Sequence, residues 1–388
     1  MSEFDHFVGT RAVGDKHAFD TAALTAWLDK NLPGFAGPLT VEMFKGGQSN
    51  PTYKLITPSQ SYVMRAKPGP VAKLLPSAHA IEREFAVMRG LHGTQVPVAQ
   101  MHCLCEDESV IGRAFYIMEF VAGRVLWDQA LPGMTTTQRG EIYNEMNRVQ
   151  AALHSVKFAE RGLASYGKPG NYFERQIGRW SKQYLASITQ PPPAGPPQGG
   201  AHPPGGLGEA KIGGNIPEMD KLIEWLPAHI PATARDEKQV SIVHGDYRMD
   251  NLIFHPTQPR VLAVLDWELS TLGHPLADFS YHCMAWHIPP GAFRGIGGLD
   301  HAALGIPSET EYIRMYCERT GTYTPDALKA DWNFYLAYNL FRIAAILQGI
   351  AKRVEAGTAA SAQAVSSAAG ARPLAQMAWS FALKAHPY

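Results

Sequence analysis

Two short apolar runs joined by a proline-containing turn constrain the fold of this chain more than any other feature. Residues 252–254 and 261–265 are β-favouring, and the six residues between them include two prolines. We predict a β-hairpin here. In an antiparallel pair, the residue that enters the first strand lies beside the residue that leaves the second. Asn251 and Asp266 occupy these positions, so we expect them to be neighbours at one end of the hairpin.

Oxygen-bearing side chains at one end of a hairpin are suited to magnesium. This ion prefers oxygen ligands, and one or two protein groups usually hold it while phosphates and waters complete the shell. Asn251 and Asp266 would supply two such groups. Asp246 lies five residues before Asn251, on the loop that leads into the hairpin, where it can accept the proton of an attacking hydroxyl. The three residues indicate phosphoryl transfer from a nucleotide.

The order of these motifs resembles the aminoglycoside phosphotransferase and choline kinase family, small-molecule relatives of the protein kinases. The shared pattern is His-Gly-Asp at 244–246, Asn251 after four more residues, and Asp266 at the end of the next strand. The continuation from Asp266 to Asp278 is most similar to a phosphotransferase domain that occurs alone in bacteria and fused to acyl-CoA dehydrogenases in some animal proteins. The resemblance covers roughly residues 35 to 350 and implies ATP and magnesium as cofactors.

The first part of the chain is rich in predicted strands. A short helix from Phe19 to Asn31 with Asp20 as its N-cap precedes them. β-type runs follow, and a predicted helix interrupts them. The runs are 39–44, 53–57, 61–65, 101–105 and 114–120, with the helix at about 78–91. We predict that the first three runs form an antiparallel meander.

From Thr135 onward the chain is predicted to be helical, because apolar residues between 142 and 153 recur at spacings of three to four. Together with the resemblance, this pattern predicts an α+β, bilobal, protein kinase-like fold. We expect an N-lobe over 1–120 and a helical C-lobe over 121–388, with a catalytic hairpin at 243–268. Residues 191–214 are rich in proline and glycine, so we expect a disordered insertion there.

The resemblance places a phosphate-covering loop at Gly46 and Gly47, where glycine lets backbone amides approach phosphates closely. Ser49 and Asn50 could add side-chain donors. A Gly-Gly pair between strands is by itself more often an ordinary hairpin turn. The position of this pair in the order of motifs favours the phosphate loop.

The third strand of this family carries a cation that grips the nucleotide phosphates. The resemblance aligns Arg65 with that position, and Lys67, which faces the same way, is the alternative. Arginine can grip phosphate with two donors. Glu84 on the following helix would pair with the cation, although a solvated acidic helix face is the simpler interpretation.

The run that ends near Glu119 resembles the last N-lobe strand and the hinge between lobes. The resemblance implies that backbone groups near Glu119 to Val121 bind the adenine edge. A plain edge strand that leads into a loop is the alternative.

Residues around the predicted catalytic group have expected roles of their own. We expect His244 to orient the loop backbone and Asp250 to face solvent. Glu268 stands where protein kinases have the glycine of Asp-Phe-Gly, so no activation switch is expected, and a protein substrate is not indicated. His274, His282 and His287 could suggest a metal cluster, but their spacing favours structural histidines.

Composition excludes several functional classes. Lysine plus arginine equals aspartate plus glutamate at 35 each, so no nucleic-acid or membrane partner is indicated. Four cysteines make no disulfide framework, and the first residues lack a signal peptide pattern, so we expect a cytoplasmic protein. The most apolar helix, at about 335–350, is interrupted by polar residues, and we expect it to be too polar and too short to span a bilayer.

The acceptor is the least constrained part of the functional prediction. Acidic and basic residues are nearly balanced from Ser270 onward and form no acidic cluster, which disfavours a cationic acceptor. The resemblance favours a hydroxy acid or its CoA thioester, and Arg342 could contact a carboxylate or phosphate or form a buried ion pair. We therefore expect an ATP- and magnesium-dependent phosphotransferase that acts on a hydroxyl of a small metabolite.

Three alternatives stay open at this stage. One is a kinase for an aminoglycoside or amino alcohol. Another is a non-catalytic nucleotide-binding module that scaffolds a partner such as an acyl-CoA dehydrogenase. Assembly as a homodimer is also open.

Overall fold

The computed structural model describes most of the chain and separates it into two units. The described residues are 9–45, 50–68, 80–189, 214–236, 238–291, 295–355 and 362–385. The first unit contains residues 1–168 and 241–272, and the second contains 169–240 and 273–388. The catalytic hairpin thus groups with the strand-rich first unit. The predicted lobe boundary at residue 120 is a different division and stays a prediction. Of the predicted insertion at 191–214, all but Gly214 lies outside the described residues.

An antiparallel six-stranded sheet opens the first unit, with the strand order β1-β2-β3-β4-β6-β5. Its strands are β1 (Thr10–Arg11), β2 (Thr40–Phe44), β3 (Thr52–Ile56), β4 (Ser61–Ala66), β5 (Met101–Cys105) and β6 (Phe115–Glu119). The predicted meander is confirmed, because β2, β3 and β4 pair in sequence order.

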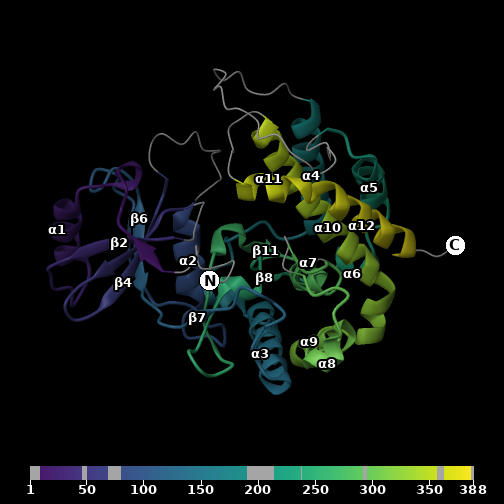
Figure 1. The fold of residues 1–388 in the computed structure, drawn as a ribbon, viewed down its shortest axis with the longest axis horizontal. Helices are drawn as coiled ribbons and strands as arrows, with labels where there is room; N and C mark the ends of the chain where they lie inside the picture. The colour runs from purple at the N-terminus through teal and green to yellow at the C-terminus, as the bar shows by residue number, and fades with distance from the viewer. Residues whose placement is uncertain are drawn as a thin grey trace. The chain divides into compact units, whose positions relative to one another are not determined.

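Each face of this sheet carries one helix. Helix α1 (Thr21–Asn31) lies on one side and α2 (Ile81–Leu91) on the other (Figure 1). Side chains alternate across a strand, so Met64 of β4 enters the core beneath α1 while its neighbour Arg65 faces α2. The predicted cap of α1 is confirmed, since the Asp20 carboxylate accepts hydrogen bonds from two backbone amides of the first turn at 2.9 and 3.0 Å.

The predicted β-hairpin is also confirmed. Strands β9 (Leu252–Phe254) and β10 (Val261–Val264) pair antiparallel, and β7 (Arg124–Val125) adds to β9. The Leu265 amide donates to the Asn251 carbonyl at 2.8 Å, which brings Asn251 to the end of the hairpin where Asp266 follows. The described residues of this unit also form α3 (Thr136–His154), β8 (Ser241–Val243), β11 (Thr271–Gly273) and the short 3-10 helices η2 (Asp15–His17), η3 (Phe158–Arg161), η4 (Met249–Asn251) and η5 (Trp267–Leu269).

Gly123, on the segment between β6 and β7, makes an unusually close approach to the hairpin. A Cβ atom at this position would lie 2.4 Å from both the Ile253 Cγ2 and the Phe254 carbonyl oxygen. Only glycine therefore lets the backbone of the hinge segment lie directly against strand β9.

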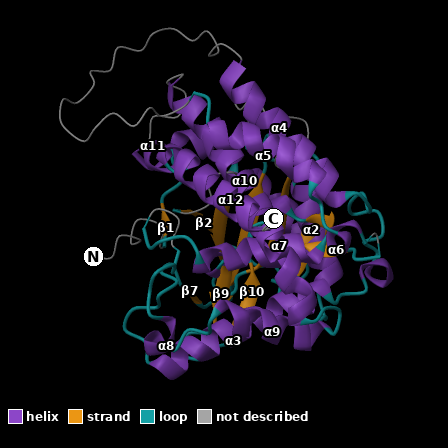
Figure 2. Cartoon of the chain, turned by 90° about the vertical axis from the view of Figure 1, so that its right-hand side faces the viewer, coloured by secondary structure: helices purple, strands orange, loops and turns teal. Residues whose placement is uncertain are grey.

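Helices dominate the second unit, as the purple elements of Figure 2 show. They are α4 (Tyr172–Thr189), α5 (Pro217–Ala228), α6 (Ala232–Arg235), α7 (Pro275–Cys283), α8 (His301–Leu304), α9 (Glu309–Thr320), α10 (Pro325–Glu355), α11 (Ala362–Ala369) and α12 (Ala371–Ala385). The long helix α10 packs against α4, α7 and α12, and buried aromatic residues such as Phe334 and Tyr338 fill the space around it.

Helix α10 is longer than the sequence led us to expect. It has 31 residues and is, by length and composition alone, long and apolar enough to cross a membrane. The prediction that this helix is too short and too polar was therefore wrong. Within its most apolar window, 78% is buried inside the protein, and a helix at the centre of a helical core passes the same test of length and composition.

Candidate active site

The loop before the hairpin is held by His244, which is fully buried. The Asp246 amide donates to its Nδ1 at 3.2 Å. The proton therefore resides on Nε2, which lies 2.7 Å from the Leu265 carbonyl oxygen and donates to it. The orienting role predicted for His244 is confirmed, since the ring links the loop to the second strand of the hairpin.

Gly245 lets the loop turn between His244 and Asp246. Its φ is +85°, and a Cβ atom here would lie 2.8 Å from the Leu269 carbonyl oxygen. We expect Gly245→Ala to lower the free energy of unfolding by about 1–3 kcal/mol, because alanine at positive φ is strained and meets backbone. Urea unfolding measures this loss. Gly112→Ala is the matched control, since Gly112 has φ +78° with nothing within 4 Å. Equal losses in the two variants would contradict the role of the contact.

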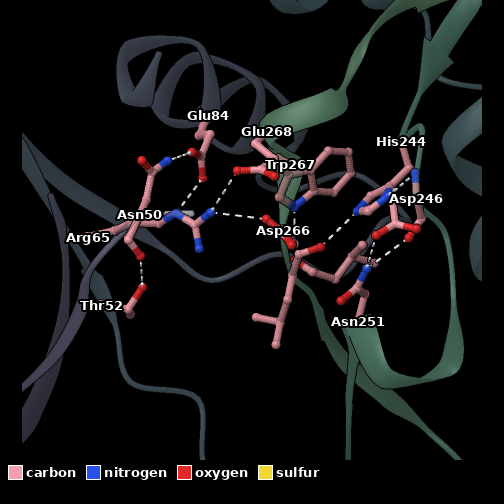
Figure 3. A network of polar contacts seen from close by, with 12 residues as sticks. Asn50, Thr52, Arg65, Glu84, His244, Asp246, Asn251, Asp266, Trp267 and Glu268 are labelled. Carbon is pink, nitrogen blue, oxygen red and sulfur yellow. Dashed lines mark hydrogen bonds and ion pairs between the residues drawn. The ribbon is translucent and has the colours of Figure 1, made fainter. Parts of the chain in front are cut away.

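The carboxylate of Asp246 contacts two side chains, Asn251, which Figure 3 shows, and Arg248. The Asn251 side-chain amide donates to its Oδ2 at 3.2 Å and to its backbone carbonyl at 2.9 Å. Its Oδ1 lies 3.2 Å from Nε of Arg248. These contacts aim the carboxylate and leave 22% of its side chain exposed, so an acceptor hydroxyl can reach it.

Arg248 was missed at the sequence level, and Asp250 was misjudged. The Arg248 guanidinium also lies 3.3 Å from Asp250, whose side chain is only 8% exposed. The prediction that Asp250 faces solvent was wrong, because this ion pair draws it inward. A cation two residues after the predicted base was the signal that could have identified Arg248.

Asn251 and Asp266 fit a magnesium ion in their donor atoms. The hydrogen bonds of Asn251 described above use its amide nitrogen, which turns the side-chain oxygen, the atom that magnesium prefers, away from Asp246. Asp266 is a carboxylate whose side chain is 37% exposed. Its backbone is left-handed, with φ 62° and ψ 61°, which is uncommon for a residue other than glycine. The strain is typical of functional positions.

Asp266 is joined to the sheet of the first unit through Arg65. The Arg65 Nη2 lies 3.0 Å from Asp266 Oδ1, and 3.8 Å from Glu268. On its other side, Arg65 Nε lies 2.9 Å from Glu84 Oε2. Burial would lower the pKa of Arg65, but Glu84, Tyr116 and the carboxylates after β10 raise it above its usual value. The pairing predicted between Arg65 and Glu84 is confirmed.

Glu84 is 2% exposed and is held by three partners. Besides Arg65, Tyr116 donates to its Oε2 at 3.1 Å and Asn50 donates to its Oε1 at 2.9 Å. Burial raises the pKa of Glu84, and the guanidinium of Arg65 opposes that rise. Asn50 is itself fully buried, so the structure places its amide behind the ion pair rather than open to a nucleotide, contrary to the predicted phosphate contact.

Lys67, the alternative cation, makes a different contact. It forms a half-exposed ion pair with Glu82, two residues before Glu84 on α2. The structure therefore connects Arg65, and not Lys67, with Asp266. The phosphate-binding role of Arg65 stays a prediction.

The structure describes only some of the other residues that were predicted to contact the nucleotide. The Glu119 amide donates to the Gln100 carbonyl at 2.9 Å, so this donor is used in the sheet and is not open to an adenine edge. Val121 lies just beyond the end of β6 and is half-buried. Gly46, Gly47 and Ser49 lie outside the described residues.

The three histidines of the second unit have structural partners, as predicted. His274 Nδ1 accepts from the Leu276 amide at 3.2 Å and caps α7, and His287 lies 2.9 Å from Glu309. Burial lowers the pKa of His282 to about 4. In the part of the chain that the structure describes, no three His, Cys, Asp or Glu side chains converge to hold a metal. A magnesium held by one carboxylate and one amide needs no such cluster.

Comparison with known families decides the classification. Residues 40–311 match the model of the phosphotransferase enzyme family. The chain belongs to the phosphotransferase enzyme family. The model that matches describes phosphotransferase enzymes. The resemblance inferred from residues 244–278 is therefore confirmed.

Relatives among characterised proteins are longer than this phosphotransferase chain. Mouse acyl-CoA dehydrogenase family member 10 is 43% identical over 379 residues, which cover 97% of the chain and 32% of the relative. Mouse acyl-CoA dehydrogenase family member 11 is 38% identical, over 96% of the chain and 44% of the relative. The chain thus spans less than half the length of these relatives.

Solved phosphotransferase structures confirm the kinase-like fold. A Ralstonia eutropha protein, described with its crystal structure as a candidate aminoglycoside phosphotransferase, is 59% identical, with a TM-score of 0.81 over 95% of this chain and all of that chain. A thermostable aminoglycoside phosphotransferase APH(4)-Ia variant, solved with ADP and hygromycin B, gives a TM-score of 0.55 at 13% identity, over 93% of this chain and 99% of that chain. The second match shows the fold alone.

Proposed function

We propose that this phosphotransferase transfers the γ-phosphate of ATP, with magnesium, to a hydroxyl of a small acyl metabolite, either a hydroxy acid or a hydroxyacyl-CoA. One observation carries the proposal. A predicted base, Asp246, shares hydrogen bonds with Asn251, and the hairpin brings Asn251 to the end where Asp266 meets Arg65. Base, proposed metal ligands and proposed phosphate cation thus belong to one connected polar network.

Asp246 accepts the proton of the acceptor hydroxyl in this mechanism. Transition states of phosphoryl transfer are loose in most analyses, so the hydroxyl keeps its proton until late and a weak base suffices. The contacts from Asn251 and Arg248 fix the direction of the carboxylate. Its main contribution is therefore to orient the hydroxyl in line with the transferred phosphorus, and then to take the proton.

Arg65 supplies a fixed positive charge for the nucleotide phosphates. Its position is set by Glu84, which Asn50 and Tyr116 hold in turn. A charge fixed in advance stabilises the transition state without reorganisation. The contact between Arg65 Nη2 and Asp266 Oδ1 keeps this cation at the hairpin end. The phosphates must lie there if Asp246 is to act.

Magnesium would be held by the side-chain oxygen of Asn251 and the carboxylate of Asp266. The ion would supply charge neutralisation at the β- and γ-phosphates. The two side chains are set in place by the chain itself, Asn251 through its bonds to Asp246 and Asp266 through Arg65.

Three findings support the choice of nucleotide and acceptor. The APH(4)-Ia structure contains ADP, which favours a nucleotide as the phosphate donor here. The long relatives are named as acyl-CoA dehydrogenases, which favours an acyl acceptor for a chain that matches part of them. The balanced charge after residue 270 also disfavours a polycationic acceptor.

A scaffold role is the second candidate, because the long relatives that this chain matches in part are named as acyl-CoA dehydrogenases. In such a protein the domain would bind nucleotide without turnover. The proposed catalytic residues Asp246, Asn251 and Asp266 are all present and connected, and a scaffold has no need for this arrangement.

Acceptor-dependent ADP formation tests the proposal. The purified protein is incubated with ATP and magnesium against hydroxy acids, hydroxyacyl-CoAs, amino alcohols and aminoglycosides, and each reaction is repeated with EDTA. We expect magnesium-dependent ADP formation with a hydroxy acid or hydroxyacyl-CoA. Turnover of only amino alcohols or aminoglycosides would refute the acyl acceptor, and tight ATP binding without any turnover would favour the scaffold.

A further inference from the structure

We propose that Arg83, on helix α2, is a positioning residue for Asp266. It anchors the segment 266–270 to α2 and thereby holds the Asp266 carboxylate where the proposed magnesium site needs it. This inference rests on the proposed function, because it takes Asp266 as a magnesium ligand.

Two buried groups hold the Arg83 head group. Its Nη2 donates to the Ser270 carbonyl at 3.2 Å, and its guanidinium carbon lies 4.4 Å from the ring centre of Tyr166. Ser270 and Tyr166 are 3% and 6% exposed. A charged hydrogen bond combined with a cation–π contact is stronger than either alone. The side chain therefore connects α2 to the backbone of the 266–270 segment.

Tyr166 cannot easily shift to follow a displaced arginine. Its amide donates to the Leu163 carbonyl at 3.0 Å, and Leu163 packs so closely on α2 that a Cβ atom at Gly90 would lie 2.8 Å from it. The next residue, Gly167, approaches the Leu272 amide so closely that a Cβ atom there would lie 2.5 Å away. The ring therefore offers Arg83 a fixed surface.

The 266–270 segment needs such an anchor because it begins with a strained residue. Asp266 has left-handed backbone angles, which cost free energy for a residue with a side chain and persist only where neighbouring contacts impose them. Trp267, which is 1% exposed, donates from its indole to the Val264 carbonyl at 2.9 Å. Arg83 secures the far end of the turn at Ser270.

Neighbouring residues of α2 hold both ends of this segment. Glu84 reaches Asp266 through Arg65, while Arg83 reaches Ser270 directly. Loss of Arg83 leaves the Arg65–Glu84 pair in place and releases only the second attachment. The expected defect is therefore in the geometry of Asp266, and not in the phosphate-binding cation.

Hydrogen exchange and magnesium kinetics on Arg83→Met, Arg83→Lys and Arg89→Met test the anchor. Arg89 is the matched control, because it is exposed on the same helix and lies 5.6 Å over the Phe85 ring. In the nucleotide-free protein, we expect faster amide exchange in residues 266–272 of Arg83→Met, with slow exchange kept elsewhere. During turnover, we expect its KM for magnesium to rise about five- to tenfold, the factor that corresponds to about 1.0–1.4 kcal/mol.

The conservative variant and the control separate positioning from general stability. Arg83→Lys retains a cation over the ring and one donor, so it should restore part of the magnesium affinity, whereas Arg89→Met should match the wild type in both measurements. Unchanged exchange at 266–272 in Arg83→Met, or the same magnesium defect in Arg89→Met, would overturn the proposal. If the wild type transfers no phosphate, the proposed function fails, and the exchange comparison still decides whether Arg83 anchors the segment.

Discussion

Asp246→Ala is expected to lower turnover by about a hundred- to ten-thousandfold, the range that a positioned general base contributes. Nucleotide affinity should stay close to that of the wild type, because the proposed nucleotide and metal groups are on other residues. Steady-state ADP release with the best acceptor measures the first quantity, and titration with ATP and magnesium measures the second.

The loss must be separated from a folding defect, since Asp246 also holds Asn251 and Arg248. Thermal unfolding of the variant gives that check. Asp29→Ala, which removes an exposed aspartate of α1, is a control for the loss of one carboxylate. Wild-type turnover in Asp246→Ala would eliminate this residue as the base and, with it, the proposed mechanism.

Arg65→Met is expected to have the largest effect on stability. It leaves Glu84, which is 2% exposed, as a buried carboxylate without its cation, and breaking such a pair typically costs about 3–5 kcal/mol. Denaturant unfolding measures the loss. We also expect much weaker ATP binding, because the proposed phosphate cation is gone.

The loss of stability in Arg65→Met should depend on pH in a defined direction. Burial raises the pKa of Glu84, and the guanidinium of Arg65 is the largest influence that opposes this rise, ahead of the hydrogen bonds from Tyr116 and Asn50. Without Arg65 the folded variant therefore favours the protonated carboxyl more than the wild type does. For a carboxyl whose folded pKa lies above its unfolded pKa, the contribution to stability is retained at low pH and lost as pH rises through the folded pKa. The stability difference between wild type and Arg65→Met should therefore narrow as pH falls from neutral.

Two further variants separate the structural and functional parts of this effect. Glu84→Gln, added to Arg65→Met, removes the buried charge, while its amide oxygen can accept from Asn50 and its amide nitrogen can donate to the hydroxyl oxygen of Tyr116. The double variant should regain stability but not ATP affinity. Lys67→Met is the matched control, two residues after Arg65 and just past the end of β4, and its half-exposed pair with Glu82 should contribute about 0–1 kcal/mol. Weaker ATP binding in Lys67→Met than in Arg65→Met would assign the phosphate contact to Lys67.

The sequence was sufficient for features that depend on local patterns. The hairpin around Asn251 and Asp266 follows from two apolar runs and a turn, and antiparallel pairing alone brings its two ends together. The cap of α1 at Asp20 follows from residue type and position. The Arg65–Glu84 pair could not be predicted from a local pattern, because the two residues are on different elements. The family resemblance supplied the alignment that predicted it.

Features that depend on packing between distant segments could not be predicted in this way. Asn50 was taken as a phosphate donor because it follows two glycines, but its partner Glu84 is 34 residues away. Asp250 was expected to face solvent because it is charged, and the neighbouring Arg248 instead draws it to 8% exposure. The Arg83–Ser270 contact joins residues 187 positions apart. The Asn50–Glu84 and Arg83–Ser270 contacts leave no periodic or local trace in the sequence, whereas the Arg248–Asp250 pair is local, and the cation after the predicted base is its signal.

The contact between Gly123 and strand β9 limits which residues position 123 can hold. A side chain at position 123 would have to displace the Phe254 carbonyl and the Ile253 side chain, and β9 is the strand that follows Asn251 directly. One substitution at the hinge segment would therefore alter the proposed adenine-binding backbone and the proposed metal ligand together. Tolerated replacements at this position should be rarer in a saturation-mutagenesis screen than at Gly112, where a Cβ atom meets nothing within 4 Å.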